Sequence, residues 1–270
     1  MLRLEHTDVQ RWVERPERGW PVLLLLLLIS TIASLLASSV LGVRLLRLAA
    51  RTRELPELMI GSSFIISGVI GYVIMLAGSP GGGAVPLETA ERLFSTGYAL
   101  IGVGVCCIYV FIWRTFRVDA MWASVLALAG ILAVVATSHD PLSALVTRGP
   151  LFWLGLIGRI GAGAWGACES LLWWSRMRRR LALGLADPVV ANRFLLWGLA
   201  NVTTSSIFLA STFTMPVQTG QPAAAAAMSA SGVLVISSIT FFTASVQWLA
   251  FFPPKRYLGW VCQGGVTADA

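Results

Sequence analysis

Long apolar runs separated by short polar segments dominate the chain. A helix that crosses the hydrocarbon core of a bilayer needs about 20 mainly apolar residues, because it rises about 1.5 Å per residue and must satisfy its own backbone groups. Seven segments meet this requirement, and they cover residues 20–43, 58–78, 93–113, 121–138, 151–174, 189–215 and 226–252. The pattern predicts an all-α integral membrane protein, folded as a bundle of seven transmembrane helices.

Basic residues are unevenly divided between the two ends of these segments. The N-terminal tail and the connections after the second, fourth and sixth segments carry six Lys or Arg residues, and four acidic residues offset those of the tail. The opposite side carries twelve: Arg44, Arg47, Arg51, Arg53, Arg114, Arg117, Arg176, Arg178, Arg179, Arg180, Lys255 and Arg256. Since basic loops stay in the cytoplasm, we expect the N-terminus outside and the C-terminus inside, in a multi-pass protein of the cell membrane.

The connections are short and contain the residues that break helices, as at 79–83, 139–141 and 220–222. We therefore expect an external tail over residues 1–19, a membrane domain over 20–252 and a cytoplasmic interfacial tail over 253–270. A cleavable signal peptide is the alternative interpretation of the leucine run at 23–28. Its apolar stretch exceeds the roughly 7 to 15 residues of a signal core, which favours a first membrane helix.

Composition agrees with this class, since 56% of the 270 residues are hydrophobic and 12% are charged. The net charge of +7 is typical of loops that face anionic lipid head groups, so we expect membrane lipids as partners. Other membrane subunits are a further expected class of partner. The sequence contains no basic run interleaved with aromatic residues, which is the pattern that would indicate nucleic-acid binding.

Few residues offer catalytic or metal chemistry. The two histidines, His6 and His139, have no ligand partners at a useful spacing, and the cysteines Cys106, Cys107 and Cys168 lie in apolar segments. No nucleophile set or phosphate-binding glycine loop is present, so we expect no enzyme, no metal and no cofactor. Retinal is excluded because the single lysine, Lys255, lies beyond the seventh segment.

Arg159 is the most informative residue, since an ionisable group at membrane depth is costly and therefore a functional candidate. It lies eight residues into the fifth segment, about 12 Å below the outer boundary by helix rise. Polar residues of the sixth and seventh segments fall at a similar depth. The predicted ligand-binding set is Arg159, Asn201, Thr204, Ser237 and Thr240, with a small anion or carboxylate as ligand. The alternative is that Arg159 reaches water and pairs with Asp140, Glu88 or Glu91, while the hydroxyls only join helices.

Glu169 and Arg193 fall near the inner boundary in the fifth and sixth segments. Their shared depth predicts an ion pair between the two helices, which is either a structural link or a gate.

Several residue types recur at the same spacing in the first three and in the last three segments. A shift of 132 places Arg44 on Arg176, and a shift of 135 places Trp113 on Trp248 and Phe116 on Phe251. This indicates a parallel 3+1+3 repeat, or only the generic residue preferences of membrane helices.

The overall plan resembles seven-helix receptors, microbial rhodopsins and three-plus-one-plus-three sugar transporters in topology alone, without a diagnostic motif. The sequence thus predicts a sensor or receptor-like protein that binds a small ligand in the bundle. A secondary transporter or permease, and a non-catalytic subunit of a membrane complex, are the alternatives.

Overall fold

The computed structural model describes residues 20–78, 86–138, 148–214 and 230–266, and these ranges contain helices and no strand. The predicted tail 1–19, Asp140 and much of the outer connections lie outside the described residues. Within the described ranges, the helical prediction is confirmed.

Among the described residues, six helical segments have the length and composition to cross a membrane, which supports a multi-pass helical membrane protein. The second of them is continuous but contains one wider π-helical turn, η1. The segments are α2 (Trp20–Thr52); α3 (Leu55–Ile65), η1 (Ile66–Gly71) and α4 (Tyr72–Ala77) together; α5 (Leu87–Phe116); α8 (Pro150–Leu181); α9 (Pro188–Thr214); and α10 (Ala230–Phe251).

The fourth predicted segment forms a shorter helix, α6 (Met121–Ala136), of 16 residues. Its length of about 24 Å by helix rise is less than the roughly 30 Å of hydrocarbon in a bilayer. The seven-helix topology therefore stays a prediction. The direction of the neighbouring helices agrees with it, because α5 and α8 run parallel: Tyr98 lies beside Arg159, and Arg117 beside Glu169. The chain between them must return along the bundle.

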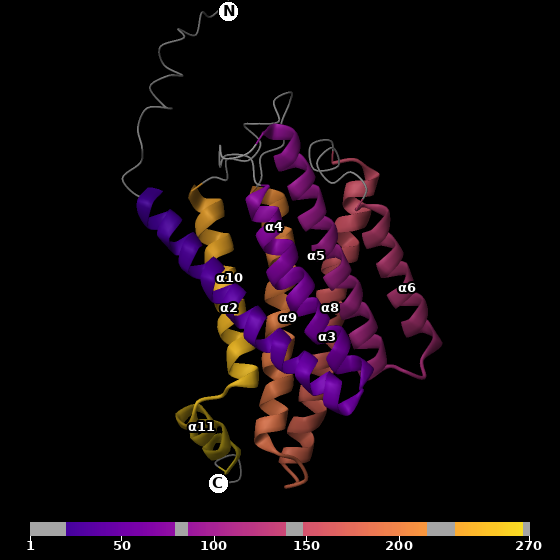
Figure 1. Ribbon diagram of the computed structural model, residues 1–270. Coiled ribbons are helices and arrows are strands. Elements are labelled where there is room, and N and C mark those ends of the chain that lie inside the picture. The colour runs from indigo at the N-terminus through magenta and orange to yellow at the C-terminus, as the bar shows by residue number, and fades with distance from the viewer. Residues whose placement is uncertain (1–19, 79–85, 139–147, 215–229, 267–270) are drawn as a thin grey trace, which may run out of the picture.

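The contacts between the long helices form a closed ring, and Figure 1 shows these helices side by side in one bundle. Going round it, α2 packs against α3, α3 against α5, α5 against α8, α8 against α9, α9 against α10, and α10 against α2. Helix α6 packs against α5 and α8 from outside this ring, at the edge of the molecule. Along the chain, three of the long helical segments thus precede α6 and three follow it.

Glycines allow the helices of the first group to approach closely. A Cβ atom on Gly97 of α5 would lie 2.6 Å from the carbonyl oxygen of Gly71 and would collide with the backbone of Met75. Close contact through small residues is the usual means of holding helices together in lipid, where no hydrophobic effect drives them into contact. The η1 turn lies at this contact, since Gly71 ends it.

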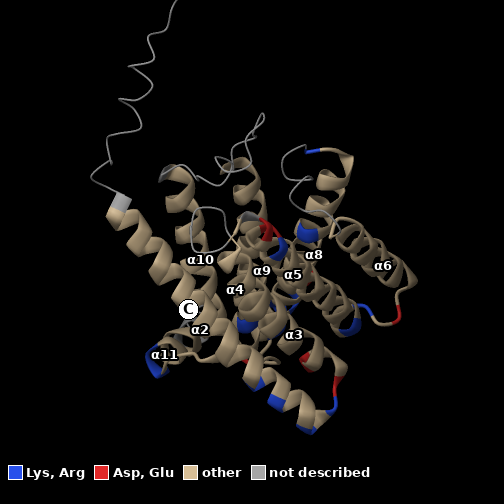
Figure 2. Cartoon of the chain, turned by 45° about the horizontal axis from the view of Figure 1, so that its top comes forward, with Lys and Arg blue, Asp and Glu red and all other residues tan. Residues whose placement is uncertain are grey.

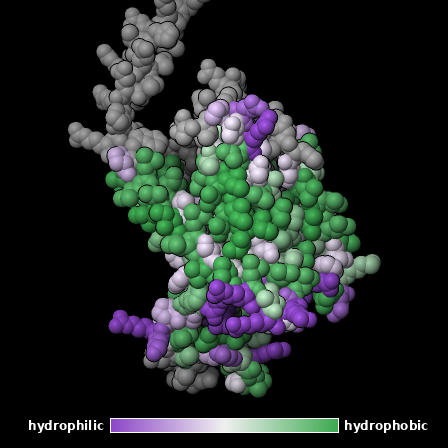
Figure 3. All heavy atoms as spheres, in the orientation of Figure 1, coloured by the Kyte–Doolittle hydropathy of each residue, from purple (hydrophilic) through white to green (hydrophobic). Residues whose placement is uncertain are grey.

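The surface of the bundle divides by polarity. Figure 3 shows hydrophobic side chains across the middle of one face and hydrophilic ones gathered at its lower end. Large apolar side chains on α2 and α6 are more than half exposed, among them Leu36 and Leu128. Figure 2 places many of the basic residues at the lower end, along α2 and at the start of α11 (Lys255–Val266). This is the arrangement expected of a bundle surrounded by lipid, with its basic end in the head-group layer.

Candidate functional site

Two charged side chains are buried among the described residues, Arg159 and Glu169, and both belong to α8. This helix starts with Pro150 at its first position and places Arg159 about two and a half turns further on. Arg159 is 2% exposed and Glu169 is 3% exposed. Arg159 thus points into the bundle, as the predicted ligand-binding set requires, whereas an outward-opening cavity beside it stays a prediction.

The Arg159 guanidinium lies between α5, α6 and its own helix. Its Nη1 donates hydrogen bonds to Thr137 Oγ1 at 3.1 Å and to the carbonyl oxygen of Gly155 at 3.2 Å. Its central carbon lies 4.1 Å from the centre of the Tyr98 ring, in cation–π contact. Nε and Nη2 are buried and have no hydrogen-bond partner among the described residues. The charge is therefore only partly compensated by this part of the protein.

Glycine on α8 makes this arrangement possible. A Cβ atom on Gly155 would lie 2.6 Å from Cγ2 of Thr137. Without that Cβ, the end of α6 approaches α8 closely enough for the Thr137 hydroxyl to accept from Arg159. On the side of α5, Gly102 faces Nη2, since its Cβ would lie 3.7 Å from that nitrogen.

The polar residues that the sequence grouped with Arg159 belong to two other helices, α9 and α10. Asn201 donates to the carbonyl oxygen of Trp197, and Thr204 to that of Ala200, both within α9. Ser237 and Thr240 belong to α10, which packs against α9 and α2 and not against α6. No hydrogen bond of the described residues joins these four side chains to Arg159, and the predicted grouping stays a prediction. A ligand role for Arg159 itself stays a prediction.

The carboxylates that the alternative interpretation assigned to Arg159 do not meet it either. Glu88 pairs with Arg92 at 2.6 Å, where both side chains are exposed, and Glu91 is exposed on the same turn of α5. Asp140 lies outside the described residues. Among the described residues, no acidic side chain balances the Arg159 charge.

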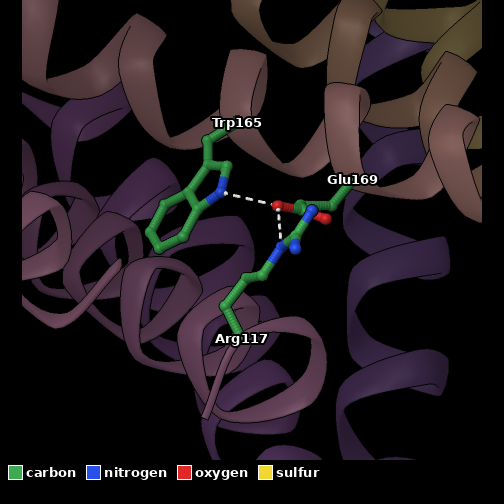
Figure 4. A network of polar contacts seen from close by, with 3 residues as sticks. All are labelled: Arg117, Trp165 and Glu169. Carbon is green, nitrogen blue, oxygen red and sulfur yellow. Dashed lines mark hydrogen bonds and ion pairs between the residues drawn. The ribbon is translucent and has the colours of Figure 1, made fainter. Parts of the chain in front are cut away.

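Glu169 pairs with Arg117 and not with Arg193, so the predicted partner was wrong. Arg117 Nε donates to Glu169 Oε1 at 2.7 Å, and Trp165 Nε1 donates to the same oxygen at 3.4 Å, as Figure 4 shows. This hydrogen bond raises the pKa of the Arg117 guanidinium above its usual value. Glu169 Oε2 has no hydrogen-bond partner among the described residues, and Arg193 is exposed on α9.

Aromatic side chains surround this ion pair. The Arg117 guanidinium lies 5.7 Å from the ring centre of Trp122, whose ring centre is 6.1 Å from that of Trp165. Tyr109 packs against Trp165 at 6.2 Å and donates to the carbonyl oxygen of Gly158 at 2.7 Å. One polar and aromatic cluster therefore joins the C-terminal parts of α5 and α8 to the start of α6.

Sequence reasoning missed Tyr98, Thr137 and Arg117, although a signal for each was present. Tyr98 and Arg159 lie at similar distances from the starts of α5 and α8, and both helices run in the same direction. Thr137 follows the last residue of α6, and Arg117 directly follows α5, where it was counted only as a loop charge. Counting depth on parallel helices would have placed Tyr98 near Arg159.

The described residues contain no group of three or more His, Cys, Asp or Glu side chains able to hold a metal ion. Comparison with protein-family models, with curated proteins and with solved structures found no match for this chain.

Proposed function

We propose that this chain is a membrane protein of sensor or receptor type that binds a small carboxylate or oxyanion at Arg159. The observation that carries the proposal is the pair of buried nitrogens Nε and Nη2, which have no hydrogen-bond partner in the described part of the chain. A buried charge with unsatisfied donors costs several kcal/mol, so a ligand that satisfies them binds with that gain.

The geometry of the guanidinium selects the class of ligand. Nε and Nη2 lie on one edge of the planar group, while Nη1 is already used by Thr137 and Gly155. Two parallel N–H groups on one edge match two oxygens of a carboxylate or oxyanion. The Tyr98 ring packs on one face of the guanidinium, and it does not occupy the edge that carries Nε and Nη2.

Ligand-dependent thermal unfolding of the purified protein in mild detergent tests this proposal. Acetate and sulfate should raise the Tm of the wild-type protein, and chloride should raise it less because a single atom cannot bridge two donors. Arg159→Lys keeps the charge but removes the two-donor edge, so acetate and sulfate should lose their advantage over chloride. Arg92→Gln is the matched control, since it removes an exposed guanidinium that is paired with Glu88.

The stability of the Arg159→Gln variant separates a ligand site from a structural residue. If Arg159 is a ligand site, the free protein carries an uncompensated charge, so the Arg159→Gln variant should have the same or a higher Tm than the wild type without anions. Acetate should not change the Tm of this variant. A structural residue predicts a clear loss of Tm in the variant. That loss, together with no anion effect on the wild type, would refute the proposal.

A secondary transporter of 3+1+3 type is the second candidate. The helix order supports it. If α2, α3–α4 and α5 are matched with α8, α9 and α10, the contact between α5 and α8 corresponds to the contact between α10 and α2. Arg44 of α2 donates to the carbonyl oxygen of Phe251 at the end of α10, and Trp173 of α8 packs against Phe116 at the end of α5. Uptake of labelled acetate by proteoliposomes distinguishes the two candidates, since a receptor binds acetate without carrying it across.

A further inference from the structure

The junction between α10 and α11 gathers basic side chains at the inner end of the bundle. Pro253 and Pro254 separate the two helices, and Lys255 and Arg256 begin α11 with both side chains exposed. Arg44 of α2 reaches the same junction. Its guanidinium lies 4.8 Å from the ring centre of Phe252 and donates to the carbonyl oxygen of Phe251 at 3.5 Å. Two helices far apart in sequence thus bring three cations to one place.

These cations have no acidic partner within the described ranges. The ion pairs among the described residues are Arg92 with Glu88 and Arg117 with Glu169, so Arg44, Lys255 and Arg256 belong to neither. Arg193, which directly follows Asn192 on α9, is also exposed and unpaired in this part of the chain. A group of cations without counter-charges favours an anionic partner.

A hydrogen bond and aromatic contacts hold α11 in place beside this group. Asn192 Nδ2 donates to the Tyr257 hydroxyl at 2.8 Å, which attaches α11 to α9. The ring centre of Tyr257 lies 6.1 Å from that of Trp260, and Trp260 is 70% exposed. A basic first turn followed by an exposed tryptophan is the pattern of a helix that lies in the head-group layer.

The surface of α10 next to this junction indicates which class of anion lies close to the three cations. Phe241, Phe242 and Trp248 on α10 are 50%, 48% and 42% exposed, so lipid chains must cover this helix down to the junction. Figure 3 shows the hydrophilic side chains at this level directly below the hydrophobic face. The phosphate groups of the adjacent leaflet therefore lie at the height of Arg44, Lys255 and Arg256.

We propose that Arg44, Lys255, Arg256 and the exposed face of α11 form a docking surface for the head groups of anionic phospholipids. The phosphate and any further negative group bind the cations, and Trp260 enters the boundary between head groups and acyl chains. Anionic lipid then fixes α11 along the membrane. This surface is separate from Arg159 and does not depend on the proposed ligand.

A nitroxide label on Cys262 of α11 tests the proposal, because this cysteine is exposed and lies two residues after Trp260. The full chain, with the other three cysteines replaced by alanine, is placed in nanodiscs of phosphatidylcholine with increasing phosphatidylglycerol. The label should become immobilised and shielded from an aqueous relaxing agent as the anionic fraction rises. High salt should reverse part of the effect because it screens the charges.

Two double variants with equal charge separate a local docking surface from general attraction. A basic residue near an anionic membrane surface contributes about 1 kcal/mol, or roughly a fivefold change in affinity. The variant K255Q/R256Q should therefore need a much larger anionic fraction for half of the effect, corresponding to about a twenty-fivefold weaker affinity. The variant R179Q/R180Q, which neutralises two exposed arginines at the end of α8, should behave as the wild type.

Equal shifts in both double variants would overturn the proposal, since net charge alone would then explain the effect. Identical label mobility in nanodiscs with and without phosphatidylglycerol would also overturn it and would leave the surface to a protein partner. Both double variants change exposed side chains, so their thermal unfolding should match that of the wild type and confirm that they are folded.

Discussion

Removal of the charge of Arg117 should cost far more stability than removal of the charge of Glu169, although the two belong to one ion pair. The Glu169 side chain is 4% exposed and that of Arg117 is 31% exposed. Arg117→Met leaves a buried carboxylate without a counter-charge, which costs about 3–5 kcal/mol. Glu169→Gln leaves a guanidinium that already reaches water and keeps an acceptor for Trp165, so its cost should be about 1–2 kcal/mol.

Unfolding of the purified protein in mixed micelles of mild detergent and dodecyl sulfate, followed by far-UV circular dichroism, measures both free energies. The double variant R117M/E169Q should be more stable than R117M alone, because the second change removes the stranded carboxylate. Arg92→Gln breaks the exposed pair with Glu88 and should change little. If Glu169→Gln costs as much as Arg117→Met, or if the two costs simply add, the burial argument is wrong.

Three further predictions test packing, the Arg159 contacts and topology. Gly97→Ala should destabilise the bundle by about 2 kcal/mol or more, because the new Cβ collides with backbone atoms, whereas Gly259→Ala meets nothing within 4 Å and should be neutral in the same unfolding assay. Thr137→Val keeps the shape but removes the acceptor for Arg159, and it should lower the free energy of unfolding by about 1.5–3 kcal/mol without loss of acetate binding in the thermal assay. A reporter inserted at residue 182 should be cytoplasmic and one at residue 83 external, and a reversed result at either position would contradict the seven-helix topology.

The positions of the helices could be predicted well, because the hydropathy of a segment depends only on which residues it contains. Predicted and observed ends agree within one residue at the start of α2, α8 and α9. The C-terminal ends of two helices were predicted too early in the sequence, since α2 continues to Thr52 and α8 to Leu181. Arginine is a good helix former whose long side chain reaches water, so a basic turn continues a helix beyond the hydrocarbon.

The contacts of the candidate site could be predicted only in part. The high cost of a charge in lipid predicts that Arg159 points inward, and this required no knowledge of its neighbours. Its partners depend on how far each helix is rotated about its axis, which small residues such as Gly155 and Gly102 decide through close packing. The same rotation directs Glu169 to Arg117 and leaves Arg193 exposed, although all three lie near one level.

Helix α6 is attached to α8 by one polar contact near each end. At the C-terminal end Thr137 accepts a hydrogen bond from Arg159, and before the N-terminal end Arg117, in the connection that leads into α6, pairs with Glu169. The two buried charges lie ten residues apart on α8, or about 15 Å by helix rise. An anion on Nε and Nη2 would leave the bond from Nη1 to Thr137 in place, so the proposed ligand and the attachment of α6 share one guanidinium. We infer that a ligand which moves Arg159 would also move α6, the one apolar helix outside the ring in the described part of the chain.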